Sequence, residues 1–465
     1  MAHAENSDGA ALLSAAREAY KSQKLDAAIA GFRQALASGA DPVAAHNDLG
    51  LALKANGRHG AAIAHYRRSL ALAPDSPEVW LNLAIALSIA GRGPEALEAA
   101  RQAAALDPDK SLTQHGAGIV ARANGEIAEA LVYFDRARSI RPDDAVIAFE
   151  RGVTLLTLGR LREGFAEYEH RRRTGRALTP DFPSPEWRGE PLDGQDILIH
   201  AEQGLGDMLQ FVRLAPSVRE RTTGRVYLEC PQPLRRLFDA IDPAIEVIPA
   251  GGPPVPHDLH VSIMSLPYVL NLGPGEEAGR TPYLRAPSPE RMASLAKRPA
   301  NRPRAALTWR GNQNNPRRSC PFDVFMAILE TPDVDFFSFQ RGDAQADIQK
   351  HGAEDLVIDL AGDLHDFADD ANALASFDIV ITIDTAFCHL AAALGKPTWT
   401  LLPFAADWRF GTDAEQCPWH PTMRLFRQTQ PGDWRQPIAA VCKALEGFVE
   451  DWRSRREAAD KGAAE

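Results

Sequence analysis

Small and aromatic residues recur at a fixed spacing of 34 residues through the first third of the chain. One register of small residues is Ala28, Ala62, Ala96, Ala130 and Gly164, and a second is Ala16, Gly50, Ala84, Gly118 and Gly152. An aromatic register is Phe32, Tyr66, Phe134 and Tyr168, with Ala100 in the middle repeat, and three units close at Pro74, Pro108 and Pro142. Small residues let antiparallel helices approach closely, and proline stops a helix. The pattern therefore predicts a row of stacked helical hairpins.

This spacing and these residue types are those of the tetratricopeptide repeat (TPR). We expect residues 1–178 to form a right-handed TPR superhelix of four repeats and a degenerate fifth. The concave face of such a superhelix commonly holds a peptide or protein, and Asn47, Asn82 and Lys54 are candidates to line it. The alternative is an arm that serves as a spacer or pairs two chains, which leaves a homodimer open.

A proline-rich stretch follows the repeats. Residues 179–195, TPDFPSPEWRGEPLDGQ, hold four prolines and little periodicity, which is typical of a packed linker between domains. We expect Trp187 to anchor it.

Short apolar runs then alternate with helical patterns to the end of the chain. Predicted strands are Asp196–His200, Arg225–Glu229, Ile245–Ile248, Leu259–Ile263, Ala305–Trp309, Asp335–Phe339, Leu356–Ile358, Ile379–Ile383 and Thr398–Leu401. Strand and helix in alternation predict parallel sheets covered on both faces. A proline-rich break near residues 299–303 divides them into two Rossmann-like domains, residues 196–300 and 301–435. Residues 436–465 hold a last helix, about Gln436–Trp452, which we expect to cross back over the first sheet, and a tail.

The predicted fold class is thus an all-α TPR superhelix followed by two parallel α/β domains. The net charge of −11 and pI near 5.7 disfavour a general nucleic-acid or anionic-membrane binder. The start of the chain does not resemble a signal peptide, and no run is long and apolar enough to span a bilayer, so we expect a soluble, cytoplasmic protein. The five cysteines are scattered without a C-x-x-C pair, which disfavours disulfides and thiolate metal sites.

Two loops carry the candidate chemistry. The first is Glu202-Gln203-Gly204-Leu205-Gly206-Asp207, after the first predicted strand. Gly204 and Gly206 permit a tight turn and a close approach of backbone. Asp207 is either an N-cap of the next helix or a general base that takes a proton from an attacking nucleophile.

The second loop follows the strand Ile379–Ile383. Asp384, Thr385 and Ala386 open a helix of small residues whose free N–H groups and neighbouring hydroxyl could hold a diphosphate. His389 lies one turn into that helix, where it could reach a phosphate or pack.

The G-L-G-D and D-T-x-x-x-H-L-A-A-A-L-G-K-P motifs together resemble the glycosyltransferase family that contains the ADP-heptose lipopolysaccharide heptosyltransferases, glycosyltransferase family 9. The resemblance spans about residues 196–449 and implies the two-domain GT-B fold. It implies that Asp207 is the catalytic base, and that Asp384, Thr385, Ala386 and His389 bind the diphosphate of the sugar donor.

The resemblance also implies a basic residue near the phosphate, after the first strand of the second domain. Arg310, Arg317 and Arg318 are the candidates, and their register is open. Arginine suits a diphosphate because its planar fork binds two oxygens at once. Gln340, after the second strand, could contact the nucleoside. No convincing D-x-D metal site is present, so we expect no metal and no cofactor beyond the nucleotide-sugar substrate.

The whole plan is similar to that of flagellin and O-linked protein glycosyltransferases, which join TPR repeats to a transferase. The leading hypothesis is transfer of a hexosyl, heptosyl or nonulosonyl group from a nucleotide-sugar to a Ser or Thr hydroxyl of a protein bound by the TPR arm. The alternatives are a glycan or lipid-linked acceptor, and a TPR adaptor that keeps a sugar-nucleotide site without turnover. The resemblance implies inversion at the anomeric carbon and leaves the sugar, nucleotide and acceptor open.

Overall fold

The computed structural model describes residues 2–175, 182–273, 275–276, 281–288, 301–312, 315–413 and 415–462. The chain divides into two compact units, Met1–Thr154 and Leu155–Glu465. The predicted domain limits at residues 178–179 and 300, the first residues of the predicted linker and the last three residues of the tail lie outside the described residues. The limits of the individual domains stay a prediction.

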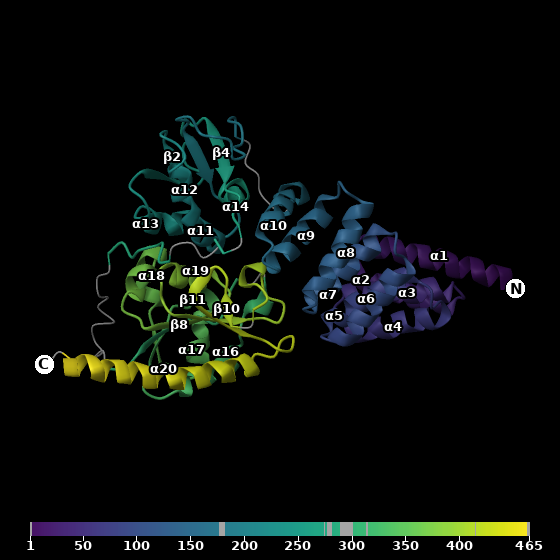
Figure 1. The fold of residues 1–465 in the computed structure, drawn as a ribbon. Coiled ribbons are helices and arrows are strands. Elements are labelled where there is room, and N and C mark those ends of the chain that lie inside the picture. The colour runs from purple at the N-terminus through teal and green to yellow at the C-terminus, as the bar shows by residue number, and fades with distance from the viewer. Residues whose placement is uncertain are drawn as a thin grey trace. The chain divides into compact units, whose positions relative to one another are not determined.

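The first unit is a row of helical hairpins, as the 34-residue spacing predicts (Figure 1). Its helices are α1 (Ala2–Lys21), α2 (Leu25–Ala37), α3 (Pro42–Ala55), α4 (His59–Leu72), α5 (Pro77–Ile89), α6 (Gly93–Leu106), α7 (Ser111–Ala123), α8 (Ile127–Ile140) and α9 (Ala145–Thr157), the last of which runs into the second unit. The small and aromatic registers form the core: Ala28, Ala62, Tyr66 and Phe134 are fully or almost fully buried.

The second unit opens with a short helix, α10 (Leu161–Tyr168), which passes directly into the 3-10 helix η1 (Glu169–Thr174). A sheet of four parallel strands in the order β3-β2-β1-β4 follows. Its elements are β1 (Ile197–His200), α11 (Leu205–Phe211), α12 (Ala215–Arg219), β2 (Val226–Cys230), α13 (Arg235–Phe238), β3 (Ile245–Pro249), β4 (Leu259–Ser262) and α14 (Leu266–Val269). Trp187 of the linker is buried and donates its Nε1–H to the carbonyl of Glu190.

The second sheet has seven strands in the order β10-β11-β9-β8-β5-β6-β7, and only β10 runs antiparallel to its neighbour. Its elements are β5 (Arg304–Leu307), η5 (Pro316–Arg318), α16 (Phe322–Phe325), β6 (Asp335–Ser338), α17 (Ala346–Lys350), β7 (Val357–Asp359), α18 (Phe367–Leu374), β8 (Ile379–Ile383), α19 (Ala386–Ala393), β9 (Thr398–Leu402), η9 (Trp408–Phe410), β10 (Gln416–Cys417), β11 (His420–Arg427) and α20 (Arg435–Gly462). The predicted fold class is confirmed. The order reverses between β5 and β8, and ligands of such sheets bind beyond the carboxyl ends of the strands at this point.

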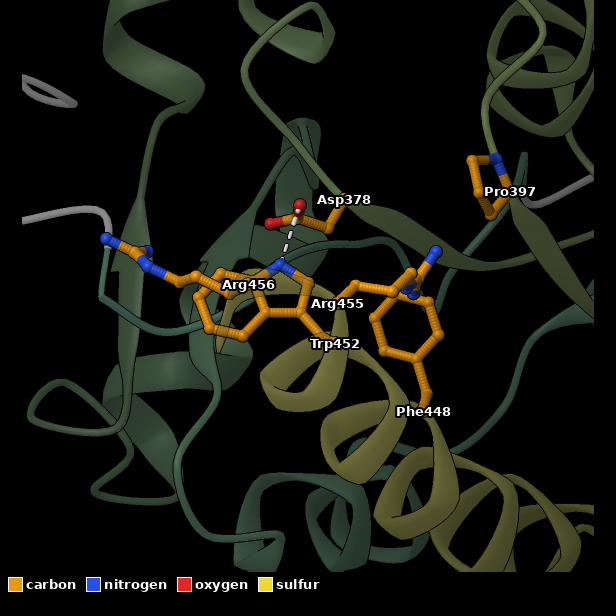
Figure 2. Close-up of a pocket in the computed structure, with 6 residues that line it drawn as sticks. All are labelled: Asp378, Pro397, Phe448, Trp452, Arg455 and Arg456. Atoms are coloured by element: carbon orange, nitrogen blue, oxygen red, sulfur yellow. Dashed lines mark hydrogen bonds between the residues drawn. The ribbon is translucent and has the colours of Figure 1, made fainter. Parts of the chain in front are cut away.

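The last helix departs from the sequence-based expectation. Instead of crossing back over the first sheet, α20 contacts β9, β11 and α16 of the second sheet (Figure 1). Its apolar stripe of Ile438, Val441, Leu445 and Val449 is buried in that sheet's core, because these residues recur every three or four positions. Near its end, the Trp452 Nε1–H donates to Asp378 at the start of β8, at 3.0 Å (Figure 2).

We predict that Gly50→Ala destabilises the helical unit. A Cβ on Gly50 would lie 2.5 Å from Cε1 of the buried Tyr66 ring, so the two helices of that hairpin would have to move apart. The expected loss is about 1–3 kcal/mol, measured as a lower midpoint of the helical unfolding transition by circular dichroism.

Gly60→Ala is the matched control, because nothing lies within 4 Å of a Cβ at that helical position. We expect it to be neutral or to stabilise by up to about 1 kcal/mol. Equal losses in the two variants would show that the close approach at Gly50 is not what limits stability.

Candidate functional site

The loop from Glu202 to Asp207 joins β1 to α11. The Asp207 carboxylate closes it on itself, since Oδ2 accepts the backbone N–H of Gly204 at 2.9 Å. Asp207 is therefore the third residue of the helix and caps its first turn from inside, with Gly204 in the N-cap position. Asp207 is thus not the N-cap residue that the sequence suggested but the third residue of the helix, and its second carboxylate oxygen is available for another partner.

Gly206 brings this loop against the second sheet's helix α19. A Cβ on Gly206 would lie 3.3 Å from Cδ2 of His389 and 3.5 Å from Cα of Ala386. The start of α11 and the start of α19 are thus in contact, and the two motifs of the sequence meet in one place. A glycine is needed here because a larger side chain would separate them.

The second oxygen of Asp207 accepts a hydrogen bond from Arg409 of η9, a partner that the sequence motifs did not assign to it. Arg409 is buried, donates its other terminal nitrogen to Asp407 at 2.8 Å, and lies 4.3 Å from the centre of the Trp408 ring. Burial raises the pKa of Asp207, and the Arg409 guanidinium opposes that shift only in part. A carboxylate with a raised pKa is a better proton acceptor near neutral pH.

Asp384 follows β8 at the point where the strand order reverses. It is buried, and burial together with the nearby Asp407 raises its pKa to about 6, while Arg318 opposes the shift. Thr385 is the N-cap residue of α19 but does not cap it with its side chain. The first N–H groups of α19 and the Thr385 hydroxyl therefore keep the arrangement that suits an anion.

The three predicted arginines have different surroundings. Arg318 lies with its Nη1 3.6 Å from the carboxylate of Asp384. Arg310 reaches toward Asp347, at 3.8 Å, and Arg317 is exposed on η5. Of the three, Arg318 is the one beside the predicted diphosphate loop.

The Gln340 side chain links two loops through hydrogen bonds to their backbones. Its side-chain oxygen accepts the backbone N–H groups of Trp309 and Arg310 at 3.0 and 2.9 Å, and its amide nitrogen donates to the carbonyls of Arg310 and Arg341 at 3.1 Å each. The amide is thus engaged with backbone on both sides. The predicted contact with a nucleoside stays a prediction, and it would have to share these atoms.

His389 is buried beside a second histidine. Its Nδ1 lies 3.2 Å from Nε2 of His420, whose Nδ1 lies 3.2 Å from Nη2 of Arg213. Burial, and after it Arg409, lowers the pKa of His389 to about 3, so the ring is neutral at physiological pH. Of the two interpretations of His389, packing and hydrogen bonding describe its present contacts; contact with a phosphate stays a prediction.

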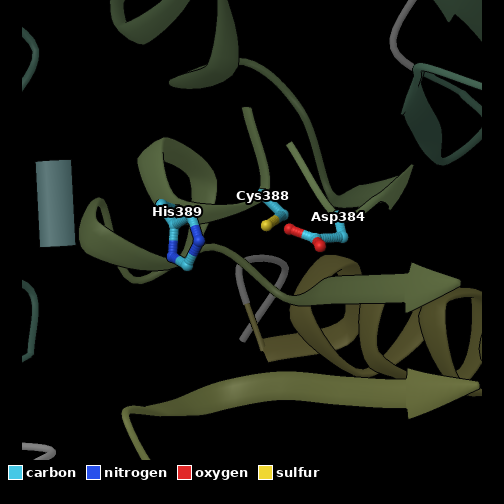
Figure 3. Close-up of side chains that lie close together, drawn as sticks. All are labelled: Asp384, Cys388 and His389. Atoms are coloured by element: carbon cyan, nitrogen blue, oxygen red, sulfur yellow. The ribbon is translucent and has the colours of Figure 1, made fainter. Parts of the chain in front are cut away.

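Asp384, Cys388 and His389 place three potential metal-ligand atoms within 4.8 Å of one another, and Figure 3 shows the Cys388 sulfur directed toward the Asp384 carboxylate. Their surroundings disfavour a cation. Burial, and after it Asp384, raises the pKa of the Cys388 thiol well above its usual range, and the thiol donates to the Thr385 carbonyl. The Arg318 guanidinium already supplies positive charge there. The neighbouring Arg318, rather than these three side chains, is what favours an anion at this place.

The aromatic residues after β9 pack against one another and against other buried rings. Trp408 and Trp419 are buried and contact Phe165 and Phe211, with ring centres 5.6–6.4 Å apart. Sequence reasoning treated this stretch as a loop and missed β11. The buried Arg409 in their midst is the signal that could have indicated a partner carboxylate, because a buried arginine needs one.

The candidate groove residues of the helical unit are partly engaged with each other. Asn82 donates to the Asn47 side chain at 3.1 Å, which links α3 to α5, and burial lowers the pKa of Lys54. Their contact with a partner protein stays a prediction.

Two cavities of the α/β unit are lined by residues other than those described above. One, of about 450 Å³, lies at the amino ends of β8 and β9 between Asp378, Pro397 and the end of α20 (Figure 2). Another, of about 780 Å³, lies beside β7 and α17 and is lined by Asp343, Asp359 and Glu354 among others.

Comparison with known proteins supports the repeat assignment. Two family models, both described as tetratricopeptide repeat, match residues 13–77 and 53–115. The chain is 31% identical to Protein FlbA of Caulobacter vibrioides in an alignment over 323 residues, and the match covers 62% of this chain and 52% of FlbA. The chain thus spans about half the length of this curated relative. The matched share exceeds that of the helical repeats, so the similarity includes part of the α/β region.

Two solved structures are similar to 35–37% of the chain, at low TM-scores. Pseudomonas aeruginosa pilF is 20% identical, with a TM-score of 0.34, over 37% of this chain and 78% of pilF. YrrB, described as a TPR protein with an unusual peptide-binding site, is 17% identical, with a TM-score of 0.30, over 35% of this chain and 84% of YrrB. Within the described residues, no helix is both long and apolar enough to cross a membrane.

We predict that Asp384→Asn becomes more stable than the wild type as the pH rises, because the wild type loses stability. The pKa of Asp384 is raised from 3.8 to about 6, so ionisation between these values costs the folded state free energy, up to about 3 kcal/mol above pH 6. The melting temperatures of the variant and the wild type should coincide near pH 4 and separate in favour of the variant by pH 7.5. A separation that is the same at both pH values would contradict the raised pKa.

Proposed function

We propose that this protein is a glycosyltransferase that uses a nucleotide-sugar and modifies a protein bound by its TPR repeats. The observation that carries the proposal is the contact between the Asp207 loop of one parallel sheet and the start of α19 at the switch point of the other. A base from one domain beside an anion site in the other is what a sugar transfer between two bound substrates needs.

The charges at this point favour an anionic ligand. The Nε atoms of Arg318 and Arg409 are buried and have no hydrogen-bond acceptor among the described residues. Buried guanidinium N–H groups without acceptors are costly, and a diphosphate could supply acceptors for both. The N–H groups at the start of α19 and the Thr385 hydroxyl would complete the diphosphate site.

The ion pair between Arg409 and Asp207 couples sugar-donor binding to the base. A diphosphate would compete with Asp207 for Arg409, and loss of that partner would raise the pKa of the carboxylate further. The acceptor hydroxyl oxygen then attacks the anomeric carbon, the bond from that carbon to the diphosphate oxygen breaks, and the hydroxyl proton passes to Asp207. Arg318 and Arg409 stabilise the charge that develops on the leaving nucleoside diphosphate. A single displacement of this kind inverts the anomeric carbon.

The acceptor side of the proposal rests on the TPR repeats. Repeats of this type bind proteins, and holding an acceptor near the transferase raises its effective concentration. A Ser or Thr hydroxyl is the acceptor group that fits a carboxylate base.

The first test is a thermal-shift panel with UDP-, GDP-, ADP-, CMP- and dTDP-linked sugars. We expect one class to stabilise the wild type by a few degrees, since a ligand at about a hundred times its Kd contributes about 2.7 kcal/mol. Arg318→Ala should lose the shift because it removes the arginine beside Asp384. Arg317→Ala, one residue away and exposed, is the matched control and should keep it.

The second test separates binding from chemistry. Asp207→Asn should keep the thermal shift and lower transfer of labelled sugar to protein by about 10²–10⁴-fold, because a carboxamide cannot accept the hydroxyl proton. The transferase proposal fails if no nucleotide-sugar shifts the wild type, or if Asp207→Asn transfers sugar at the wild-type rate. Binding without transfer in the wild type would favour the adaptor alternative.

A further inference from the structure

An arginine interrupts the small-residue pattern at the end of the repeats. Four repeats place a small, fully buried residue in the same register, namely Ala35, Ser69, Ala103 and Ala137. The fifth places Arg171 there, on η1, with 1% of the residue exposed. A buried charge in a position that holds alanine or serine elsewhere needs partners, and two of them, Glu202 and Ser265, lie outside the helical hairpin.

Arg171 holds the glycine loop by a two-pronged ion pair. Its Nε and Nη2 donate to the two carboxylate oxygens of Glu202, both at 2.7 Å. Nη2 also donates to the Ser265 hydroxyl at 2.8 Å, and Nη1 donates to Glu169 at 2.6 Å. Glu202 is buried as well, and it opens the loop that ends in Asp207. Such a bidentate pair fixes orientation as well as distance.

The next loop residue is held in an unusual conformation. Gln203 has a φ of +65°, which costs a non-glycine residue free energy and persists only where the surroundings enforce it. Its side-chain amide donates to the Tyr168 hydroxyl at 3.1 Å. Arg171 of η1 and Tyr168 of α10 thus hold the first two residues of the loop, Glu202 and Gln203.

The same helical segment also packs against the tryptophan that holds Arg409, the ion-pair partner of Asp207. Phe165 and Tyr168 of α10 pack on the Trp408 ring, with centres 5.7 and 6.0 Å away. Trp408 in turn carries the Arg409 guanidinium on its face. Both the carboxylate and the guanidinium of the Asp207–Arg409 pair are therefore positioned against one short element.

We propose that Arg171 is a positioning residue that orients the Asp207 loop through Glu202, and that the degenerate fifth repeat has become the support of the transfer site. The inference rests on the proposed role of Asp207 as the base. A buried ion pair adds little to stability over an apolar pair of the same size, whereas it constrains geometry closely. A misplacement of about 1 Å in a reacting group can lower a rate about a hundredfold.

The test uses the full chain in four forms: wild type, Arg171→Met, Arg171→Met with Glu202→Gln, and Arg172→Gln. Arg171→Met alone leaves Glu202 unpaired and should lower the melting temperature. The double variant removes both charges and should recover most of it. Arg172→Gln is the matched control, because Arg172 is the next residue of η1 and contacts Glu186, Glu169 and Ser265 rather than the loop.

We would make two measurements on each form of the protein. Hydrogen exchange of the peptide over residues 200–211 reports the order of the loop without any ligand. Steady-state transfer, with the nucleotide-sugar that stabilises the wild type, reports kcat and KM. In the double variant we expect faster exchange in this peptide and a kcat about a hundredfold lower, with KM for the nucleotide-sugar within about twofold because its site is on the other sheet.

Recovery of both melting temperature and kcat in the double variant would overturn the inference, since Arg171 would then serve stability alone. Unchanged exchange over residues 200–211 in the variants would overturn it independently of activity. Faster exchange in the variants, together with no transfer by the wild type, would instead refute the proposed function while leaving the structural role of Arg171 intact.

Discussion

The contact between α11 and α19 is the constraint on which the rest of the site depends. Gly206 favours it, because a Cβ there would lie 3.3 Å from Cδ2 of His389 and crowd that ring. Through this contact, a loop that belongs to one parallel sheet reaches the switch point of the other. The Asp207–Arg409 ion pair, which joins residues 202 positions apart, exists only because the two sheets meet in this way.

The buried charges at this contact destabilise the folded chain when no ligand is bound. Asp207, Asp384 and Asp407 lie near one another with Arg318 and Arg409 among them, and burial raises the pKa of both Asp207 and Asp384. A carboxylate that resists ionisation and guanidinium nitrogens without acceptors are destabilising features. They become intelligible if an anion binds there, since it supplies the missing acceptors and displaces the carboxylates from the arginines.

Local pattern was sufficient to predict the elements but not the partners. The 34-residue spacing and the apolar runs identified the repeats and strands β1 to β9, because periodicity and burial act over a few residues. The hairpin of β10 and β11 escaped because Pro418 and Pro421 lie within it, and proline argues against a strand. The path of α20 was predicted wrongly, because its apolar stripe does not specify which sheet it covers.

In the candidate site, too, the motifs could be predicted from the sequence but some contacts between residues could not. Asp207, Asp384 and Arg318 lie together, and their motifs could be found from the sequence alone. Arg409 could not be matched to Asp207 by spacing, since the contact depends on how two domains pack. Gln340 looked like a ligand residue because it ends a strand at the right edge, yet its amide is engaged with the backbone around Arg310.

The degenerate repeat is the place where departure from a pattern was itself informative. Tyr168 keeps the aromatic register of Phe32, Tyr66 and Phe134, but its ring contacts Trp408 of the α/β region. Three residues later, Arg171 replaces the alanine or serine of the earlier repeats and binds Glu202. A terminal repeat has no following repeat to cover it, so its surface must be polar or find another partner. In this chain that partner is the glycine loop, and the residues that close the repeat are the ones that orient the candidate base.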